Sequence, residues 1–284
     1  MSDDMYSIDV EAWINRVAAD PVARRQRQAM EIVLHSIARL LPKYRLYLKG
    51  GLLMGLVHDS PRQTTDIDLT AGFDAEPGID ERIAAELGAT FRPVAAELGY
   101  PTLTVNIHSI RPLPRGRFDT ARFPAINIKI VHTVRITNEN RHPLYFDIDI
   151  SFNEPLQQVQ ILRIADDREL HAYALVDLIA EKYRAVLQQI PRRRERRQDI
   201  YDLHYLTAGN EIDDSGKCQV LKALQVKCRS RDIEPIQTSL ADPEIRRRSE
   251  ARWDSLELEL GQVPAFETCY EQAKAFYESL PWGK

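Results

Sequence analysis

The sequence predicts an α/β (α+β) protein in which a lobe built on a mixed sheet is followed by an all-helical lobe. Two observations carry this expectation. Alternating apolar and polar residues, the pattern of half-buried strands, recur up to about residue 165, whereas from Tyr173 onward the apolar runs have helical spacing. We therefore expect two domains, residues 1–165 and 166–284, with a cleft between them. Ligand sites concentrate in such clefts.

The elements follow from local patterns. Two helices are expected over residues 9–41, broken near Pro21, because proline lacks the N–H that a helix interior needs. A strand at 44–48 leads into Gly50 and Gly51, which open a helix after a tight turn. The first lobe should also hold strands at 65–71, 102–110, 125–136 and 144–152, a helix at 79–88 and a basic loop at 111–124. The second should hold helices at 173–190, 196–208, 218–228, 244–260 and 268–280.

Composition narrows the class of protein. The 284 residues are 44% apolar and 28% charged, with a formal net charge of -4, so any site for a polyanion must come from local clustering. Three cysteines without a CxxC pair indicate neither a disulfide framework nor a zinc site. The acidic N-terminus and the absence of a long apolar run predict a cytoplasmic protein that does not engage a membrane.

Two acidic pairs suggest a metal site. In a strand, Asp66 and Asp68 share one face about 7 Å apart, and Asp147 and Asp149 repeat the pattern in "FDIDIS". If the two strands pair, up to four carboxylates converge on one patch, which favours a hard cation such as magnesium. Such alternation also marks the solvated face of an ordinary sheet. The sequence "KGG" before a helix favours the metal site, because a helix N-terminus binds phosphate.

The helical half carries a second set of charged residues. Lys182 lies on an amphipathic helix, and Asp199 and Asp202 share one face of the next helix. Between them, residues 192–197 read "RRRERR". Such a run is typical of a solvated turn, and a lysine such as Lys182 is usually exposed on its helix. Both could instead bind the phosphates of a nucleotide or of RNA. Arg246, Arg247 and Arg248 either extend the same basic surface or are unrelated to it.

Taken together, "KGGLLMG", "RQTTDIDL", "FDIDIS", "EKYRAVL" and "RRQDIYDL", between residues 47 and 206, resemble the AbiEii/AbiGii-type nucleotidyltransferase toxins of type IV toxin–antitoxin systems, which include the MenT toxins. The resemblance implies a polymerase β-like nucleotidyltransferase lobe with a mixed sheet and a C-terminal helical lobe. It further implies magnesium-dependent transfer of NMP from an NTP to a tRNA 3′ end, which blocks aminoacylation and translation, and a cognate antitoxin encoded nearby.

The resemblance also assigns roles to residues. The phosphate-binding turn falls on Gly50 and Gly51, preceded by Lys49. The metal-binding pair falls on Asp66 and Asp68, and the third acidic position on Asp149, with Asp147 as the alternative. The catalytic set is completed by Lys182, which also binds nucleotide, and by Asp199, while Asp202 is assigned to the fold. We add Arg62 and Thr65, in "RQTTDIDL", as nucleotide-binding candidates.

One position departs from the family pattern. Leu52 stands where members usually carry Ser or Thr, so a hydroxyl that bonds phosphate is missing. Two other functions remain open: a small-molecule nucleotidyltransferase of the aminoglycoside-modifying type, and a catalytically silent binding protein on the same scaffold. Basic grooves formed by residues 111–122 and 192–197 would favour RNA, whereas an acidic pocket would favour a cationic drug.

Overall fold

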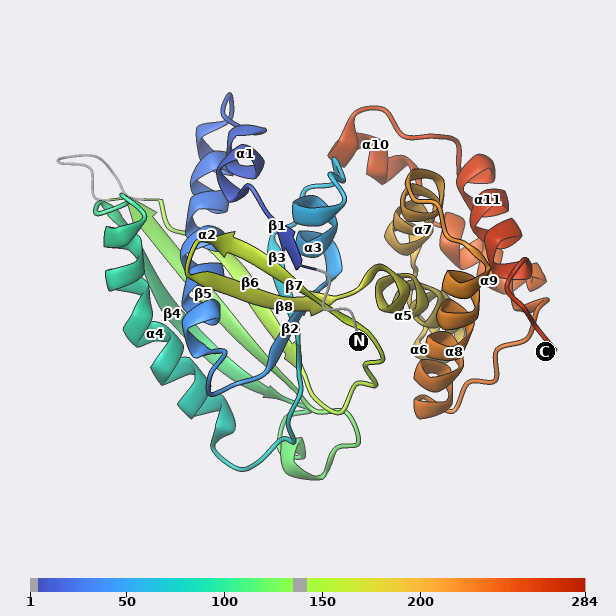
Figure 1. The fold of residues 1–284 in the computed structure, drawn as a ribbon, viewed down its shortest axis with the longest axis horizontal. Helices are drawn as coiled ribbons and strands as arrows, with labels where there is room; N and C mark the ends of the chain where they lie inside the picture. The colour runs from blue at the N-terminus through green and yellow to red at the C-terminus, as the bar shows by residue number, and fades with distance from the viewer. Residues whose placement is uncertain (1–4, 135–141, 284) are drawn as a thin grey trace. The chain divides into compact units, whose positions relative to one another are not determined.

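The computed structural model describes residues 5–134 and 142–283, and the chain divides into two compact units (Figure 1). Unit 1 takes the chain up to Asp59, then Thr64–Glu154 and Gln160–Ala172. Unit 2 takes Ser60–Gln63, Pro155–Val159 and everything from Tyr173. Two short segments that precede Tyr173 in the sequence therefore belong to the second unit.

Within the described residues, unit 1 holds one mixed eight-stranded sheet in the order β1-β7-β8-β2-β3-β6-β5-β4. Its strands are β1 (Met5–Ser7), β2 (Leu46–Lys49), β3 (Asp66–Ala71), β4 (Leu103–Leu113), β5 (Ala125–Val134), β6 (Leu144–Ser151), β7 (Val159–Ala165) and β8 (Arg168–Tyr173). Its helices are α1 (Val10–Asn15), α2 (Pro21–Leu40), α3 (Gly50–Val57) and α4 (Ile79–Glu97).

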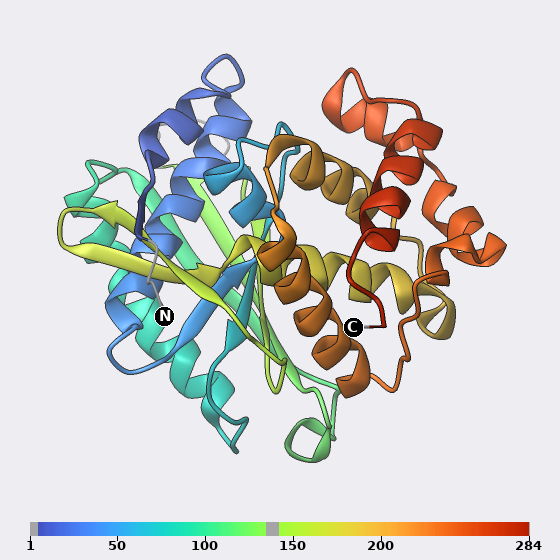
Figure 2. The same cartoon turned by 45° about the vertical axis from the view of Figure 1, so that its right-hand side comes forward.

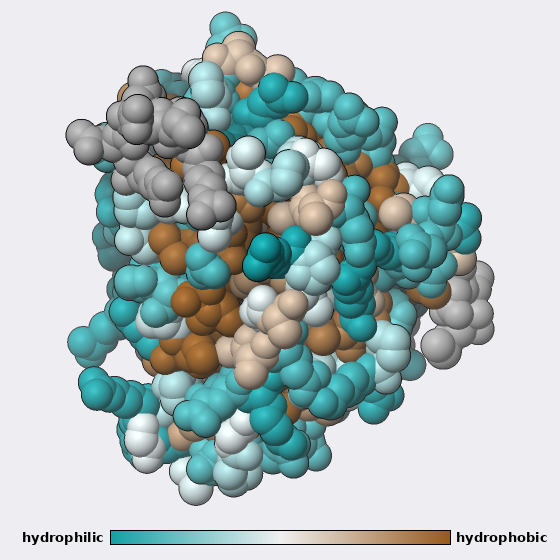
Figure 3. Space-filling view, turned by 90° about the vertical axis from the view of Figure 1, so that its left-hand side faces the viewer, coloured by the Kyte–Doolittle hydropathy of each residue, from teal (hydrophilic) through white to brown (hydrophobic). Residues whose placement is uncertain are grey.

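Strict alternation gives the sheet two different faces. Along β5, Ile126, Ile128 and Ile130 are fully buried, whereas the residues between them are partly exposed. The buried face is covered by helices: α2 and α4 pack against each other, and Gly88 of α4 lies against the side chain of Ile107 on β4 (Figure 2). The surface drawn in Figure 3 is mostly hydrophilic, with apolar side chains gathered near its middle.

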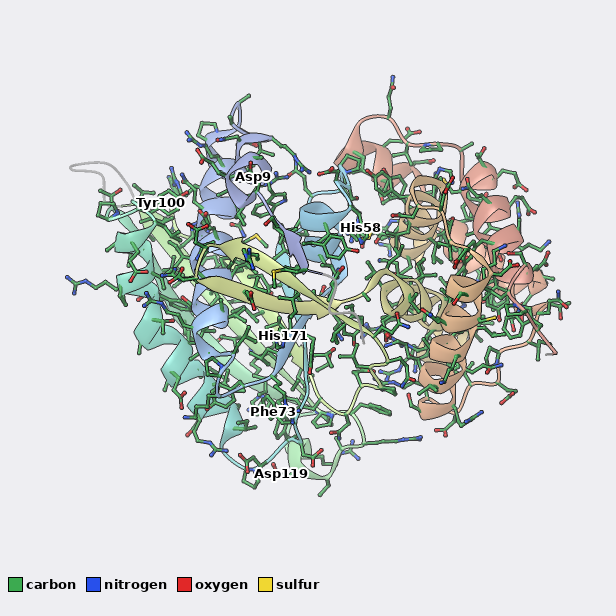
Figure 4. All side chains as sticks on the ribbon, viewed as in Figure 1. Asp9, His58, Phe73, Tyr100, Asp119 and His171 are labelled. Atoms are coloured by element: carbon green, nitrogen blue, oxygen red, sulfur yellow. The ribbon has the colours of Figure 1, made fainter. Side chains whose placement is uncertain are left out.

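The helix starts follow from capping. Asp9, labelled in Figure 4, accepts a hydrogen bond from Ala12 N at the start of α1. Asp20 accepts from Val22 N and Ala23 N at the start of α2, where Pro21 takes the first helical position. The expected break near Pro21 is therefore present: α1 ends at Asn15, and α2 begins at Pro21 with its own aspartate cap.

Unit 2 contains helices and a short 3-10 turn (Ser239–Ala241) among the residues that the structure describes. They are α5 (Leu175–Leu187), α6 (Gln189–Arg192), α7 (Arg197–Gly209), α8 (Asp214–Ser230), α9 (Pro243–Glu250), α10 (Asp254–Leu260) and α11 (Phe266–Glu278). Helix α5 packs on both α7 and α8. Tyr183 at its centre is fully buried, and its hydroxyl donates to Ala273 O at 2.7 Å. None of the described helices, in either unit, is long and apolar enough to span a bilayer.

A buried ion pair ties residues 155–158 to α5 and α8. Asp177 is fully buried and accepts hydrogen bonds from the backbone N–H groups of Gln157 and Gln158. Its partner is Lys227, with Nζ to Oδ1 at 2.8 Å, and the same ammonium donates to Pro155 O at 2.7 Å. Neither charge is left without partners, which is the condition for burying it.

Several expectations about elements were wrong. No strand was expected at residues 159–173, yet they form β7 and β8, a hairpin with Gln160, Leu162 and Leu170 directed inward. Helix α4 continues past Gly88 to Glu97, and its last turns bury Phe91 and Val94. The run at 244–260 is two helices, separated near Arg252, whose φ is +60°. The basic loop is shorter than expected, since residues 111–113 pair with β5. The last two residues of the strand expected at 125–136 lie outside the described residues.

Lys227→Ala should reduce the free energy of unfolding by about 3 kcal/mol, because it leaves the buried Asp177 carboxylate without its cation. Chemical denaturation followed by circular dichroism measures the change. Lys222→Ala is the matched control, since Lys222 is an exposed lysine of the same helix. Equal stabilities for the two variants would contradict the anchoring role of the pair.

Candidate active site

Parallel pairing of β3 with β6 gathers the carboxylates. Asp66 lies opposite Asp147, and Asp68 lies opposite Asp149. Directly paired residues of neighbouring strands point to the same side of a sheet, so all four share one side, which we call the carboxylate face. The intervening Ile67, Ile148 and Ile150 are buried on the other side. The convergence expected from the two acidic patterns is therefore present.

Neighbouring strands continue two cross-strand rows on this face. The first row runs through Lys49, Asp68, Asp149, Asn127 and Arg111; the second runs through Asp66, Asp147, Lys129 and Ser109. Asn127 Nδ2 donates to Asp149 Oδ1 at 2.9 Å, and Lys129 Nζ lies 3.9 Å from Asp147 Oδ1. The sequence patterns did not single out Asn127 or Lys129, because only the pairing of β5 with β6 brings them to the acidic pairs.

The electrostatics of this face favour a cation. Partial burial, followed by repulsion from Asp147 and Asp149, raises the pKa of Asp66. Asp147 Oδ1 is buried and accepts no hydrogen bond from any of the described residues. Both features would be relieved by a divalent cation, which takes oxygen ligands. Among the described residues no three acidic, histidine or cysteine side chains already have the arrangement of a metal site. The donor set fits magnesium, which is commonly held by one or two carboxylates plus waters and substrate phosphates.

The glycine turn lies directly against this face. Gly50 has φ +69°, and a Cβ there would lie 2.8 Å from Cγ of Asp68 and closer still to Oδ2. Only glycine accepts both the left-handed backbone and the contact. Helix α3 begins here, and the side chain of its N-cap residue, Lys49, makes no capping hydrogen bond to the N–H groups of the first turn. Lys49 Nζ donates to Ser151 Oγ at 3.3 Å.

Two residues near the turn have different surroundings. Leu52 is fully buried, so the position at which the resemblance led us to expect a hydroxyl contributes to the core. Thr65 is exposed, and its hydroxyl lies 3.4 Å from Asp66 Oδ1. A threonine hydroxyl is therefore present beside the acidic pair, after the turn rather than within it.

In unit 2, a separate cluster surrounds the fully buried Asp202. Lys182 Nζ donates to Asp202 Oδ2, and Arg62 donates to both of its oxygens at 3.2 and 3.3 Å. Burial acts to raise the pKa of Asp202, but Arg62 and Lys182 outweigh it, so the pKa is lowered. Asp199 Oδ1 lies 3.5 Å from Lys182 Nζ, and Arg196 binds the other oxygen at 3.4 Å. Lys182 is therefore held chiefly by Asp202, and Arg62 is bound to a protein carboxylate.

The arginine clusters differ in how far they are neutralised. Arg246, Arg247 and Arg248 all form ion pairs with glutamates, namely Glu244, Glu267 and Glu271. In contrast, several exposed arginines form no ion pair with any residue in the described ranges 5–134 and 142–283; they are Arg111, Arg115, Arg117, Arg192, Arg193 and Arg194. Positive charge available to a ligand therefore remains in both of the basic clusters seen in the sequence.

Comparisons with known proteins give the family and the fold of this chain. The sequence model of the family described as "Nucleotidyl transferase AbiEii toxin, Type IV TA system" matches residues 32–272. No curated protein matches significantly. A Helicobacter pylori crystal structure provisionally described as a nucleotidyltransferase is similar, with TM-score 0.55 and 12% identity over 91% of this chain and 94% of that one. JHP933 from Helicobacter pylori gives TM-score 0.52 and 14% identity over 88% and 90%. At such identities the structures show a shared fold.

Asp66→Asn should stabilise the metal-free protein near neutral pH, because it removes one of the mutually repelling carboxylates. The gain should be below about 1 kcal/mol, since water screens the partly exposed group. A raised native pKa favours folding at low pH and is a cost once pH exceeds that pKa. The gain should therefore vanish well below the ordinary aspartate range. Thermal unfolding in EDTA across pH measures it, and a destabilised variant would contradict the repulsion.

Asp202→Ala should cost about 3 kcal/mol of stability, because it leaves Lys182 and Arg62 buried without their anion. Lys182→Ala should cost clearly less, since Arg62 still pairs with Asp202. A lowered native pKa stabilises the fold above the ordinary aspartate pKa, and this stabilisation is lost as pH falls through the lowered value. Denaturation curves for both variants give the comparison. If Lys182→Ala proved the more damaging, Arg62 would not be sufficient to neutralise Asp202.

Proposed function

Because this chain belongs to the AbiEii family of nucleotidyltransferase toxins of type IV toxin–antitoxin systems, we propose that it transfers NMP from an NTP to the 3′ end of tRNA. Such transfer would block aminoacylation and stop translation, and a cognate antitoxin would restrain the toxin. The observation that supports this reaction best is the carboxylate face, with four aspartates on paired strands directly beside the Gly50 turn.

We assign the metal to Asp66, Asp68 and Asp149, with Asp147 as the alternative third ligand. When bound, magnesium would offset the triphosphate charge and lower the pKa of the acceptor hydroxyl. The two candidates for the third position differ in their surroundings. Asp149 is oriented by Asn127, whereas one oxygen of Asp147 has no hydrogen-bond donor within residues 5–134 and 142–283. Asn127 thus holds Asp149 in one rotamer, as a preorganised ligand requires.

The chain's own groups then account for the remaining steps. The triphosphate is cradled by N–H groups at Gly50 and Gly51, next to the ammonium of Lys49. The acceptor hydroxyl passes its proton to the Asp149 carboxylate as its oxygen bonds the α-phosphorus. The bond from that phosphorus to the bridging oxygen breaks, and pyrophosphate leaves with the electron pair. Such chemistry depends mainly on positioning and charge stabilisation.

Lys182 is proposed to stabilise charge on the leaving phosphates as a point cation, with Asp199 as its orienting partner. The cluster around Asp202 carries three cations, Lys182, Arg62 and Arg196, against two carboxylates. Lys182 contacts both carboxylates, which orient its ammonium. Arg62 and Thr65 remain proposals for nucleotide binding.

An RNA acceptor suits the available charge better than a cationic drug does. Exposed arginines without an ion partner in the described part of the chain occur in both units, including Arg115, Arg117 and Arg192. They attract a polyanion and repel a polycation. A small-molecule transferase of the aminoglycoside type is therefore less well supported. A catalytically silent binding protein would not explain why four mutually repelling carboxylates lie on one face of the sheet.

Asp68→Asn should abolish magnesium-dependent transfer of labelled NMP to total tRNA while leaving the circular dichroism spectrum unchanged. Each of the four NTPs is supplied in turn with purified protein, and Asp119→Asn serves as the control. Asp119 is an exposed aspartate of the same unit, labelled in Figure 4. Asp147→Asn and Asp149→Asn compared side by side identify the third ligand. Absence of product with the wild-type protein and all four NTPs would refute the proposed reaction.

A further inference from the structure

We propose that the part of the carboxylate face formed by β4, β5 and β6 is a platform for the single-stranded 3′ end of an RNA acceptor. The platform consists of Tyr145, His108, Lys129 and Arg111. It rests on the proposed function, because it explains how an acceptor reaches the carboxylates, and it concerns RNA binding rather than nucleotide chemistry.

Tyr145 is an exposed aromatic side chain in an ordered strand. It is 44% exposed, although the next three residues of β6 are partly or fully buried. Its ring contacts that of His108 edge to face, with centroids 5.3 Å apart. Because the tyrosine is 44% exposed despite this contact, part of its aromatic surface stays accessible. Unstacked bases bind to such rings, whatever their identity.

The positive charges of the platform lie where a phosphate backbone would pass. Lys129 Nζ is 5.9 Å from the centre of the Tyr145 ring and sits across the strand pair from Asp147. Arg111 lies opposite Asn127, in the row that contains Asp149. The loop that follows β4 adds Arg115 and Arg117, both exposed. An aromatic surface interleaved with lysine and arginine is complementary to single-stranded RNA.

The order of the rows connects the platform to the chemistry. Tyr145 precedes Asp147 by two residues on the same face of β6, and Asp149 follows two residues later. Successive residues on one face of a strand are about 7 Å apart. A base stacked on Tyr145 therefore places the next sugar and phosphate beside Lys129 and Asp147. The terminal hydroxyl is then delivered towards the carboxylates that Asp149 and Asp68 provide.

The test measures RNA binding directly. The probe is a fluorescently labelled single-stranded RNA ending in CCA, titrated with the full-length protein and followed by anisotropy. Tyr145→Ala should weaken binding about tenfold, and Tyr145→Phe should restore it, because stacking needs the ring and not the hydroxyl. Tyr6→Ala is the matched control, since Tyr6 is 45% exposed and lies in β1, at the opposite edge of the sheet.

The charge of the platform gives a second readout. Lys129→Ala should reduce the dependence of binding on salt concentration, because one phosphate contact fewer releases fewer counterions. In the transfer assay, Tyr145→Ala should raise the KM for tRNA and leave the affinity for magnesium–NTP, measured by thermal shift, unchanged. Binding of the RNA probe by Tyr145→Ala as tight as by wild type would overturn the platform. If transfer failed in the wild type but the Tyr145 variants still differed in RNA binding, the platform would stand and the proposed reaction would fall.

Discussion

The repulsion among four aspartates on paired strands is the constraint to which the rest of unit 1 is fitted. The parallel register of β3 and β6 places Asp66 beside Asp147 and Asp68 beside Asp149. Burial, followed by repulsion from Asp147 and Asp149, raises the pKa of Asp66. Two neighbours reduce the repulsion without removing it. Asn127 donates a hydrogen bond to Asp149, and Lys129 Nζ lies 3.9 Å from Asp147 Oδ1. The isoleucines on the other side of both strands hold the carboxylates in place, because one slip in register would bury them.

The sequence was informative where local pattern and function coincide. Alternation around Asp66 and Asp147 correctly placed both strands, and the glycine pair after a strand correctly placed the start of α3. It failed at β7 and β8, where short runs interrupted by charged residues gave no clear periodicity, and where only pairing with β1 and β2 makes a strand. Likewise, Asn127 and Lys129 belong to the site only through their neighbours across the sheet. Their own surroundings in the sequence carry no chemical signal.

Unit 2 shows a different use of charge. Asp177 and Asp202 are fully buried, and each is paired with a lysine and further satisfied by donors from elsewhere in the chain. The resemblance assigned Lys182 and Asp199 to the catalytic set, but nothing in the sequence indicated that Arg62 binds Asp202, which lies 140 residues away. Ion pairs between residues far apart in the sequence help to determine which segments pack together, and they cannot be predicted from local patterns in a single sequence.

The two short segments that unit 2 takes from upstream of Tyr173 have a consequence for how this protein can evolve. Residues 60–63 bring the guanidinium that neutralises Asp202, and residues 155–159 bring backbone donors for Asp177. The helical unit is thus not encoded by one uninterrupted stretch of gene. A recombination event that exchanges everything after residue 172 carries both buried carboxylates away from partners encoded upstream. The two units are compact in space, yet they cannot be inherited as separable modules.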